Sequence, residues 1–193
     1  MFIGELMDKK PKCVVVAGRP GSGKSTLIDK LSKQLYIPKV SRDEIKEGYV
    51  NTFQLKHDLL PKDTNRIVND VFKKIVLDYL EGKVSVIIEA AFNHQIWDYF
   101  IPDFIKVSDL YLLICTLDAE KSGRRHLERG LLNPKREYFH GDKRVTIYRE
   151  TGIFEPGEEY DPPQFNVPIM NISTENGYQP SLNDIEKFII GIK

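Results

Sequence analysis

The sequence predicts an α/β protein, a three-layer α/β/α sandwich around a mainly parallel, five-stranded sheet. Apolar runs that are typical of buried strands alternate along the chain with segments whose apolar residues recur at helical spacing. The first apolar run leads directly into a glycine-rich loop and then a helix. The 193 residues suffice for one domain with a sizeable core, so we expect a single domain over 1–193.

The glycine-rich loop after the first strand, expected at 13–17, carries the strongest motif. Gly18, Gly23, Lys24 and Ser25 fit the G-x-x-x-x-G-K-[ST] pattern of P-loop NTPases, in which backbone N–H groups surround phosphates, lysine reaches the β- and γ-oxygens and the hydroxyl holds Mg²⁺. The helix that follows directs its positive dipole end at the anion. A glycine/serine turn without a ligand is the alternative. The expected nucleotide-binding residues here are Gly18, Pro20, Gly21, Ser22, Gly23, Lys24, Ser25 and Thr26.

A short second strand, expected at 38–40, is followed by Asp43. Open α/β sheets place their chemistry at the carboxyl ends of strands, which favours a functional role for this carboxylate. Aspartate is also a favoured N-cap, and a helix beginning at residue 44 or 45 would use it in that way. Position alone leaves both interpretations open. Residues 48–62 are polar and mixed. Their aromatic and basic residues could line a substrate cleft or cover the edge of the core, and the sequence leaves both alternatives open.

The third strand, expected at 84–89, follows a helix at 64–81 that ends at Gly82. This strand ends in Glu89, and an acidic residue at such a strand end holds Mg²⁺ or its water in P-loop proteins. A helix cap or a solvated strand end is the alternative. Phe92 and Asn93 follow in the next loop and are expected to contact the substrate, whereas the neighbouring histidine is more simply structural.

An amphipathic segment at 95–106 is interrupted by Pro102, and its aromatic residues are expected in the core. After a fourth strand at 109–116, a helix is expected at 119–129, capped by Asp118 and ended by Gly130. Arg125 and Arg129 are four residues apart and share one helical face. Arginines near a nucleotide neutralise the migrating phosphoryl group; a solvated basic face is the alternative.

Residues 131–165 are rich in proline, glycine and charge and lack clear periodicity. Long stretches of this kind are usually functional or mobile, so we expect an excursion that covers the nucleotide or substrate site. A fifth strand is expected at 167–172, and apolar residues over 182–189 mark a closing helix.

The composition excludes some classes of protein. Lysine and arginine number 28 and aspartate and glutamate 28, without a block of one sign, which argues against a protein that coats duplex nucleic acid. Cys13 and Cys115 lie in apolar runs, as reduced core thiols of a cytoplasmic protein do. We expect no signal peptide, because the first ten residues include Asp8, Lys9 and Lys10 with only a short apolar stretch before them. No apolar stretch approaches the ~18 residues of a membrane span, and no obligatory protein partner is evident.

Four motifs together carry a family resemblance. Gly-Arg-Pro-Gly-Ser-Gly-Lys-Ser-Thr, Val-Ser-Arg-Asp-Glu-Ile-Lys, Val-Ile-Ile-Glu-Ala-Ala-Phe and Arg-Arg-His-Leu-Glu-Arg resemble the small P-loop kinases related to polynucleotide 5′-hydroxyl kinase, zeta toxin and chloramphenicol phosphotransferase. The resemblance covers most of the chain. Its first motif is specific, and the later motifs are short.

The resemblance implies a nucleoside or nucleotide kinase-like fold that uses ATP and Mg²⁺. It implies that Asp43 is the general base, that Arg42 steers the substrate, and that Arg125 and Arg129 are lid arginines. The loop containing Thr174 and Asn176 would lie against the adenine. The chain departs from the family in two ways: Glu89 stands where many relatives have aspartate, and 131–165 is longer than a minimal lid.

The function expected from these observations is transfer of the γ-phosphoryl group of Mg-ATP to a hydroxyl acceptor. The acceptor would be a small molecule, a nucleoside or a nucleic-acid 5′ end. A regulatory NTPase that hydrolyses ATP without an acceptor is the main alternative, and a nucleotide-binding module without catalysis is a further one. The chain has no Asn-Lys-x-Asp guanine signature, which disfavours a GTPase.

Overall fold

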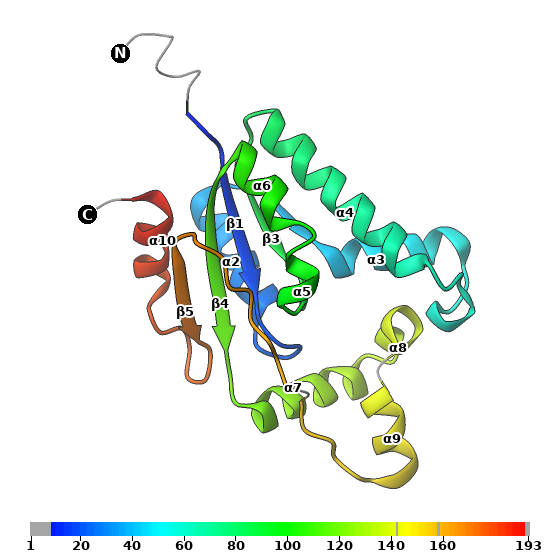
Figure 1. Cartoon of the computed structure of the whole chain (residues 1–193). Coiled ribbons are helices and arrows are strands. Elements are labelled where there is room, and N and C mark those ends of the chain that lie inside the picture. The colour runs from blue at the N-terminus through cyan, green and yellow to red at the C-terminus, as the bar shows by residue number, and fades with distance from the viewer. Residues whose placement is uncertain (1–8, 142, 158, 192–193) are drawn as a thin grey trace.

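The protein is built on one five-stranded sheet with the order β2-β3-β1-β4-β5 (Figure 1). The computed structural model describes residues 9–141, 143–157 and 159–191. The strands are β1 (Lys12–Ala17), β2 (Lys39–Ser41), β3 (Val86–Glu89), β4 (Asp109–Thr116) and β5 (Ile169–Ser173). Every neighbouring pair of these strands is parallel. The α/β prediction is therefore confirmed, with an all-parallel sheet in place of a mainly parallel one.

Helices cover both faces of this sheet, so its central strands are apolar on both sides. On β1, Cys13 and Val15 belong to one apolar core, whereas Val14 and Val16 belong to the other. The first core is covered by α4 (Thr64–Glu81), α5 (His94–Trp97) and α6 (Ile101–Val107). The second is covered by α2 (Lys24–Leu35) and α10 (Leu182–Ile190). This is the predicted three-layer sandwich.

An aromatic cluster fills the first core and corrects one expectation about the site. The ring of Phe92 stacks on Phe100 at 5.3 Å between centroids and meets Trp97 edge-on at 5.2 Å. Phe72 from α4 completes the cluster. Phe92 was expected to contact the substrate, but it is buried here. Burial among other aromatic rings stabilises its ring both by removing apolar surface from water and by ring–ring contacts.

Pro102 divides the segment at 95–106 as predicted. It occupies the first turn of α6, where a missing N–H removes no helical hydrogen bond, and α5 ends before it at Trp97. The N-cap predicted at Asp118 is also present: its side chain accepts hydrogen bonds from the backbone N–H groups of Glu120 and Lys121. These helix boundaries could be predicted because each depends on residues within a few positions of it.

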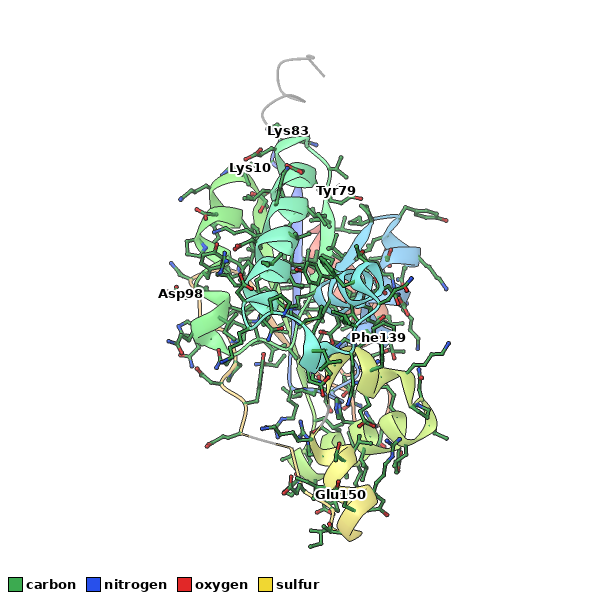
Figure 2. All side chains as sticks on the ribbon, turned by 90° about the vertical axis from the view of Figure 1, so that its right-hand side faces the viewer. Lys10, Tyr79, Lys83, Asp98, Phe139 and Glu150 are labelled. Carbon is green, nitrogen blue, oxygen red and sulfur yellow. The ribbon has the colours of Figure 1, made fainter. Side chains whose placement is uncertain are left out.

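The helices α7 (Ala119–Leu132), α8 (Lys135–His140) and α9 (Lys143–Thr151) form an arm beyond the carboxyl ends of the strands (Figure 1). In the view of Figure 2, Glu150 lies at the far end of the arm, and Phe139 lies where α8 approaches the body. The predicted excursion at 131–165 is therefore largely helical over its first half.

Gly130 does not end α7, contrary to the prediction from its residue type. The helix continues to Leu132. A Cβ at Gly130 would lie 2.5 Å from Cγ2 of the buried residue Val145 in α9. This glycine therefore allows α9 to pack closely on α7, which a pattern of local propensities does not reveal.

Both cysteines are free and buried, as predicted. Burial raises the pKa of Cys115 to about 12 and raises that of Cys13 as well, so both thiols are protonated near neutral pH. Within the described ranges, no helix has both the length and the apolar character that crossing a bilayer requires.

Candidate active site

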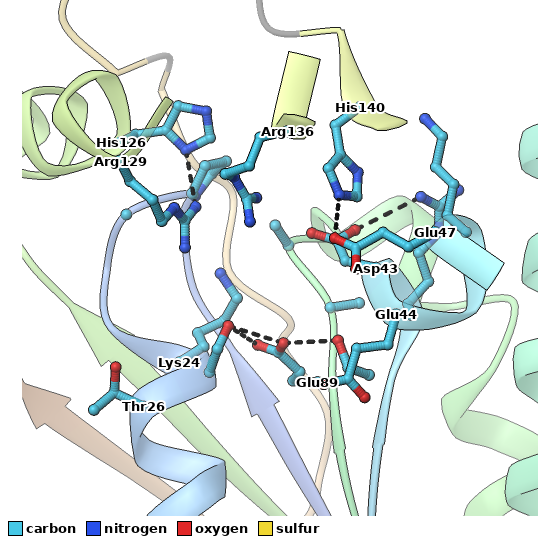
Figure 3. A pocket seen from close by; sticks show the side chains of 18 of the residues that line it. Lys24, Thr26, Asp43, Glu44, Glu47, Glu89, His126, Arg129, Arg136 and His140 are labelled. Atoms are coloured by element: carbon cyan, nitrogen blue, oxygen red, sulfur yellow. Dashed lines mark hydrogen bonds and ion pairs between the residues drawn. The ribbon is translucent and has the colours of Figure 1, made fainter. Parts of the chain in front are cut away.

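A cleft of about 480 Å³ lies at the carboxyl ends of the strands (Figure 3). One wall is the glycine-rich loop with the start of α2, and the opposite wall is the start of α3 (Arg42–Phe53). Glu89, at the end of β3, lies between the two walls, while residues of α7 and α8 line the cleft from the arm. The topology thus joins the predicted phosphate site and the predicted strand-end acids in one place.

The backbone of the glycine-rich loop has a conformation that only glycine accepts easily. Gly18, Gly21 and Gly23 have φ values of 146°, 81° and 86°. A Cβ at Gly21 would lie 2.1 Å from the carbonyl oxygen of Ser122. Both the φ values and this close approach fit a loop whose backbone N–H groups surround an anion.

Lys24 begins α2 at the floor of the cleft and is buried. Its Nζ donates a hydrogen bond to the carbonyl oxygen of Arg19, 3.0 Å away. Burial lowers the pKa of Lys24, and the nearby Glu89 carboxylate opposes that shift. A partly desolvated ammonium group held against the loop is placed to interact strongly with phosphate oxygens.

Glu89 is neither a helix cap nor a solvated strand end. It is only 6% exposed. The Ser25 hydroxyl donates to Oε1 at 3.0 Å, with a longer 3.3 Å contact to Oε2, and the Ser41 hydroxyl donates to Oε1 at 2.9 Å. Mg²⁺ prefers hard oxygen ligands and takes few of them from the protein when phosphates supply the rest, so Ser25 and Glu89 fit such a site.

Asp43 is not the N-cap of its helix. The structure begins α3 at Arg42 and puts Ser41 in the N-cap position, so Asp43 is the second residue of the helix. Its carboxylate is 54% exposed and lines the cleft, and its Oδ1 lies 3.8 Å from Nη1 of Arg42. The capping alternative is therefore removed, and Asp43 is an acidic residue of the first turn of α3 whose side chain faces the cleft.

Arg42 is held rigidly beside Asp43. Its Nε donates to Oδ1 of Asn69 at 3.1 Å, and its Nη2 donates to Oδ1 of Asn65 at 2.9 Å, so α4 fixes the guanidinium group. The guanidinium carbon lies 5.8 Å from the ring centre of Phe92. Burial lowers the pKa of Arg42, yet an arginine stays charged. Phe92 thus supports the site from behind and does not line the cleft.

The two arginines predicted to act together are separated by the structure. Arg129 lines the cleft, but Arg125 donates from Nη1 to the carbonyl of Thr174 at 3.1 Å and from Nη2 to that of Glu175 at 3.2 Å. Arg125 is one turn nearer the start of α7, where the loop after β5 passes. It therefore joins the arm to that loop, beside the expected adenine site.

The loop after β5 also contacts the glycine-rich loop directly. The Thr174 hydroxyl donates to the carbonyl of Ser22 at 2.8 Å, and Thr174 is buried. Asn176 is exposed in the turn that follows. Thr174 thus holds the loop after β5 against the glycine-rich loop.

Residues to which the sequence analysis assigned no role also line the cleft from α3, α7 and α8: Glu44, Lys46, Glu47, His126, Arg136 and His140. Nε2 of His140 lies 2.8 Å from Oε1 of Glu47, so a polar contact joins α8 to α3 (Figure 3). These two residues are 93 positions apart, and residues 131–165 show no periodicity. No signal in the sequence could have paired them.

A substitution at Gly141 can test whether the end of α8 packs against the segment that contains His57. Its φ is 63°, and a Cβ there would lie 2.0 Å from Nε2 of His57 in the 3₁₀ helix η1 (His57–Leu59). We expect Gly141→Ala to displace α8 and to speed hydrogen exchange of its amides, in addition to about 1–2 kcal/mol of backbone strain. Hydrogen exchange followed by mass spectrometry measures this displacement.

Gly152 provides the matched control for this experiment. Its φ is 71°, and nothing lies within 4 Å of its hypothetical Cβ, so Gly152→Ala adds strain without a clash. Adding His57→Ala to the Gly141→Ala variant should restore slow exchange in α8. Equal exchange in the Gly141 and Gly152 variants would contradict packing of α8 on η1.

Asn93 lies outside the cleft, contrary to expectation. Its side chain caps α5 by accepting a hydrogen bond from the N–H of Ile96 at 3.1 Å. It lines a separate cavity of about 190 Å³ together with Arg19 and Tyr160. Nδ1 of the neighbouring His94 accepts from the N–H of Gln164 at 3.1 Å, in agreement with a structural role for that histidine.

A family model described as an AAA domain matches residues 13–140 of the chain. No curated protein matches this chain. Among solved structures, a proposed kinase from Chloroflexus aurantiacus J-10-fl is similar, with a TM-score of 0.71, 17% identity, and coverage of 95% of this chain and 96% of that one.

Two further structures are similar in fold. The APS kinase CysC of Mycobacterium tuberculosis, solved with AMPPNP and APS, has a TM-score of 0.63 at 14% identity, covering 94% of this chain and 99% of that one. A chain of the Pnkp1/Rnl/Hen1 RNA repair complex has a TM-score of 0.56 at 19% identity, covering 82% of this chain and 50% of that one. The present chain therefore spans about half of that RNA repair chain.

Proposed function

The chain belongs to the AAA domain family, and from this premise we propose that it transfers the γ-phosphoryl group of ATP to a hydroxyl group of an acceptor. Its fold is that of the P-loop kinases, as the resemblance of its motifs predicted. The observation that carries the proposal is the placing of Asp43 across one cleft from the glycine-rich loop and Lys24, with Glu89 between them.

In the proposed reaction, the acceptor hydroxyl oxygen forms a bond to the γ-phosphorus while the bond from that phosphorus to the bridging oxygen breaks. The hydroxyl proton passes to the carboxylate of Asp43, and ADP leaves. The glycine-rich loop and Lys24 orient the phosphates. Arg129, which lines the cleft from the arm, neutralises charge on the migrating group.

Mg²⁺ is part of the proposal, and Ser25 and Glu89 are the residues that would hold it. When bound, the ion neutralises charge on the β- and γ-phosphates. Thr174 and Asn176 would lie beside the nucleotide base, because Thr174 contacts the glycine-rich loop through Ser22. Arg125 would stabilise this loop through its bonds to the Thr174 and Glu175 carbonyls.

The acceptor end of the cleft supports a small hydroxyl compound over a long polymer. The His140–Glu47 contact and the packing of Gly141 against His57 bring α8 over the wall formed by α3. A nucleic-acid 5′ end longer than a few nucleotides would need α8 to move away. Arg42 and Lys46 line this end, one turn apart on α3, and would contact the acceptor.

The proposal is tested by incubating the protein with Mg²⁺ and γ-labelled ATP against nucleosides, sugars, hydroxylated antibiotics and 5′-hydroxyl oligonucleotides. We expect label on one class of hydroxyl compound. Label that appears only as free phosphate would favour the regulatory NTPase instead. ATP binding without release of label would favour a binding module without catalysis.

A further inference from the structure

We propose that Ser41 is a positioning residue that sets the orientation of Glu89 at the metal-binding edge of the cleft. This inference rests on the proposed function, since it assigns Glu89 to Mg²⁺. Ser41 is the last residue of β2 and is 4% exposed. Its hydroxyl donates to Oε1 of Glu89 at 2.9 Å.

The parallel register of the sheet makes this contact possible. Ser41 of β2 is paired with Glu89 of β3, and Glu89 is paired on its other side with Val16 of β1. The two last residues of neighbouring strands therefore lie side by side at the carboxyl edge. Ser25, one residue into α2, approaches the same carboxylate from the glycine-rich loop.

Ser41 gives up the usual role of a serine in its position. It occupies the N-cap of α3, where a serine side chain normally accepts a hydrogen bond from a backbone N–H of the first turn. Ser41 makes no such bond, whereas Ser181 at the N-cap of α10 accepts from the N–H of Asp184. The hydroxyl of Ser41 is directed to Glu89 instead. Departures from a local preference of this kind are expected at functional sites.

The hydroxyl groups of Ser25 and Ser41 contact the two carboxylate oxygens of Glu89 unequally. Oε1 accepts from both Ser25 and Ser41, while the contact of Oε2 with Ser25 is longer, at 3.3 Å. An ionised carboxylate has about four acceptor positions on its two oxygens. Oε2 therefore keeps most of the unused capacity. Fixing Oε1 from two sides leaves the carboxylate a single orientation in which to meet a cation or its water.

Ser41 also connects this edge to the expected base. The same residue that holds Glu89 is the N-cap of α3, and Asp43 is the second residue of that helix. A shift of Ser41 would move both carboxylates relative to the glycine-rich loop. The metal-binding edge and the acceptor wall are thus joined through one buried side chain.

The test compares binding of the ATP analogue AMPPNP with and without Mg²⁺, measured by isothermal titration calorimetry. We expect Ser41→Ala to raise the Mg²⁺ concentration for half-maximal stimulation of binding about tenfold, because outer-shell partners typically contribute 10–100-fold to metal affinity. Binding measured in EDTA should stay unchanged. Ser41→Thr, which keeps the donor, should restore the native Mg²⁺ dependence.

Controls separate positioning from stability. Ser181→Ala removes a true N-cap hydroxyl and should lower the melting temperature without changing the Mg²⁺ dependence. Ser41→Cys keeps the side-chain volume but weakens the donor, so it serves if the alanine variant does not fold. An unchanged Mg²⁺ dependence in the folded Ala or Cys variant would overturn the role of Ser41. If the native protein itself did not bind AMPPNP, the proposed function would be overturned instead.

Discussion

Replacing Lys24 by alanine is expected to lower the rate of phosphoryl transfer by about 100- to 1,000-fold, the usual effect of deleting one preorganised electrostatic group. Lys24 is buried beside the glycine-rich loop, and the Glu89 carboxylate opposes the lowering of its pKa that burial causes. In this dry environment a positive charge acts on phosphate oxygens more strongly than it would in water. Initial rates with γ-labelled ATP measure the loss.

Lys33→Ala is the matched control for Lys24→Ala. Lys33 lies on the same helix, α2, but is exposed in its last turn and does not line the cleft. It should retain the native rate. Comparable losses in the two variants, or an unchanged rate after Lys24→Ala, would remove the glycine-rich loop from the reaction.

The layers of this fold and the positions of its strands follow from patterns that lie within short windows of sequence, whereas the strand order comes from the structure. The strand at 109–116 was predicted with the bounds that the structure gives to β4, because this run is apolar on both faces. The predicted start of α3 was wrong by two or three residues, since Asp43 looks like a cap in isolation. Packing decided the actual start: Ser41 is the paired end of β2, and the helix follows it at once.

The candidate site was predictable where it depends on local chemistry and strand ends. The glycine-rich loop is one contiguous motif, and Glu89 is an acid at the end of an apolar run. The burial of Phe92 and the separation of Arg125 from Arg129 could not be predicted. They depend on contacts with Phe100 and with the loop at 174–175, which local patterns do not reveal. The His140–Glu47 contact depends entirely on how the arm folds back over α3.

Asp43→Asn is expected to lower the turnover number by about 100- to 10,000-fold, the range that a general base typically contributes. The amide keeps the size and hydrogen-bonding capacity of the side chain but cannot accept the proton of the acceptor hydroxyl. Because Asp43 is inside α3 and does not cap it, the substitution removes no capping bond. We therefore expect the melting temperature to stay within a few degrees of the native value, and AMPPNP binding to be unchanged.

Glu44→Gln is the control for this loss, since it removes a neighbouring charge that also lines the cleft. Glu44 is 62% exposed and pairs with Lys39 at 3.5 Å, as a surface carboxylate does. Its variant should keep at least half of the native turnover number. If Asp43→Asn and Glu44→Gln had equally small effects, Asp43 would not accept the proton of the acceptor hydroxyl. It would then contribute only its negative charge to the electrostatic potential of the cleft. If Asp43→Asn abolished transfer but left ATP hydrolysis intact, the base would belong to the acceptor side of the reaction alone, as its place on the α3 wall predicts.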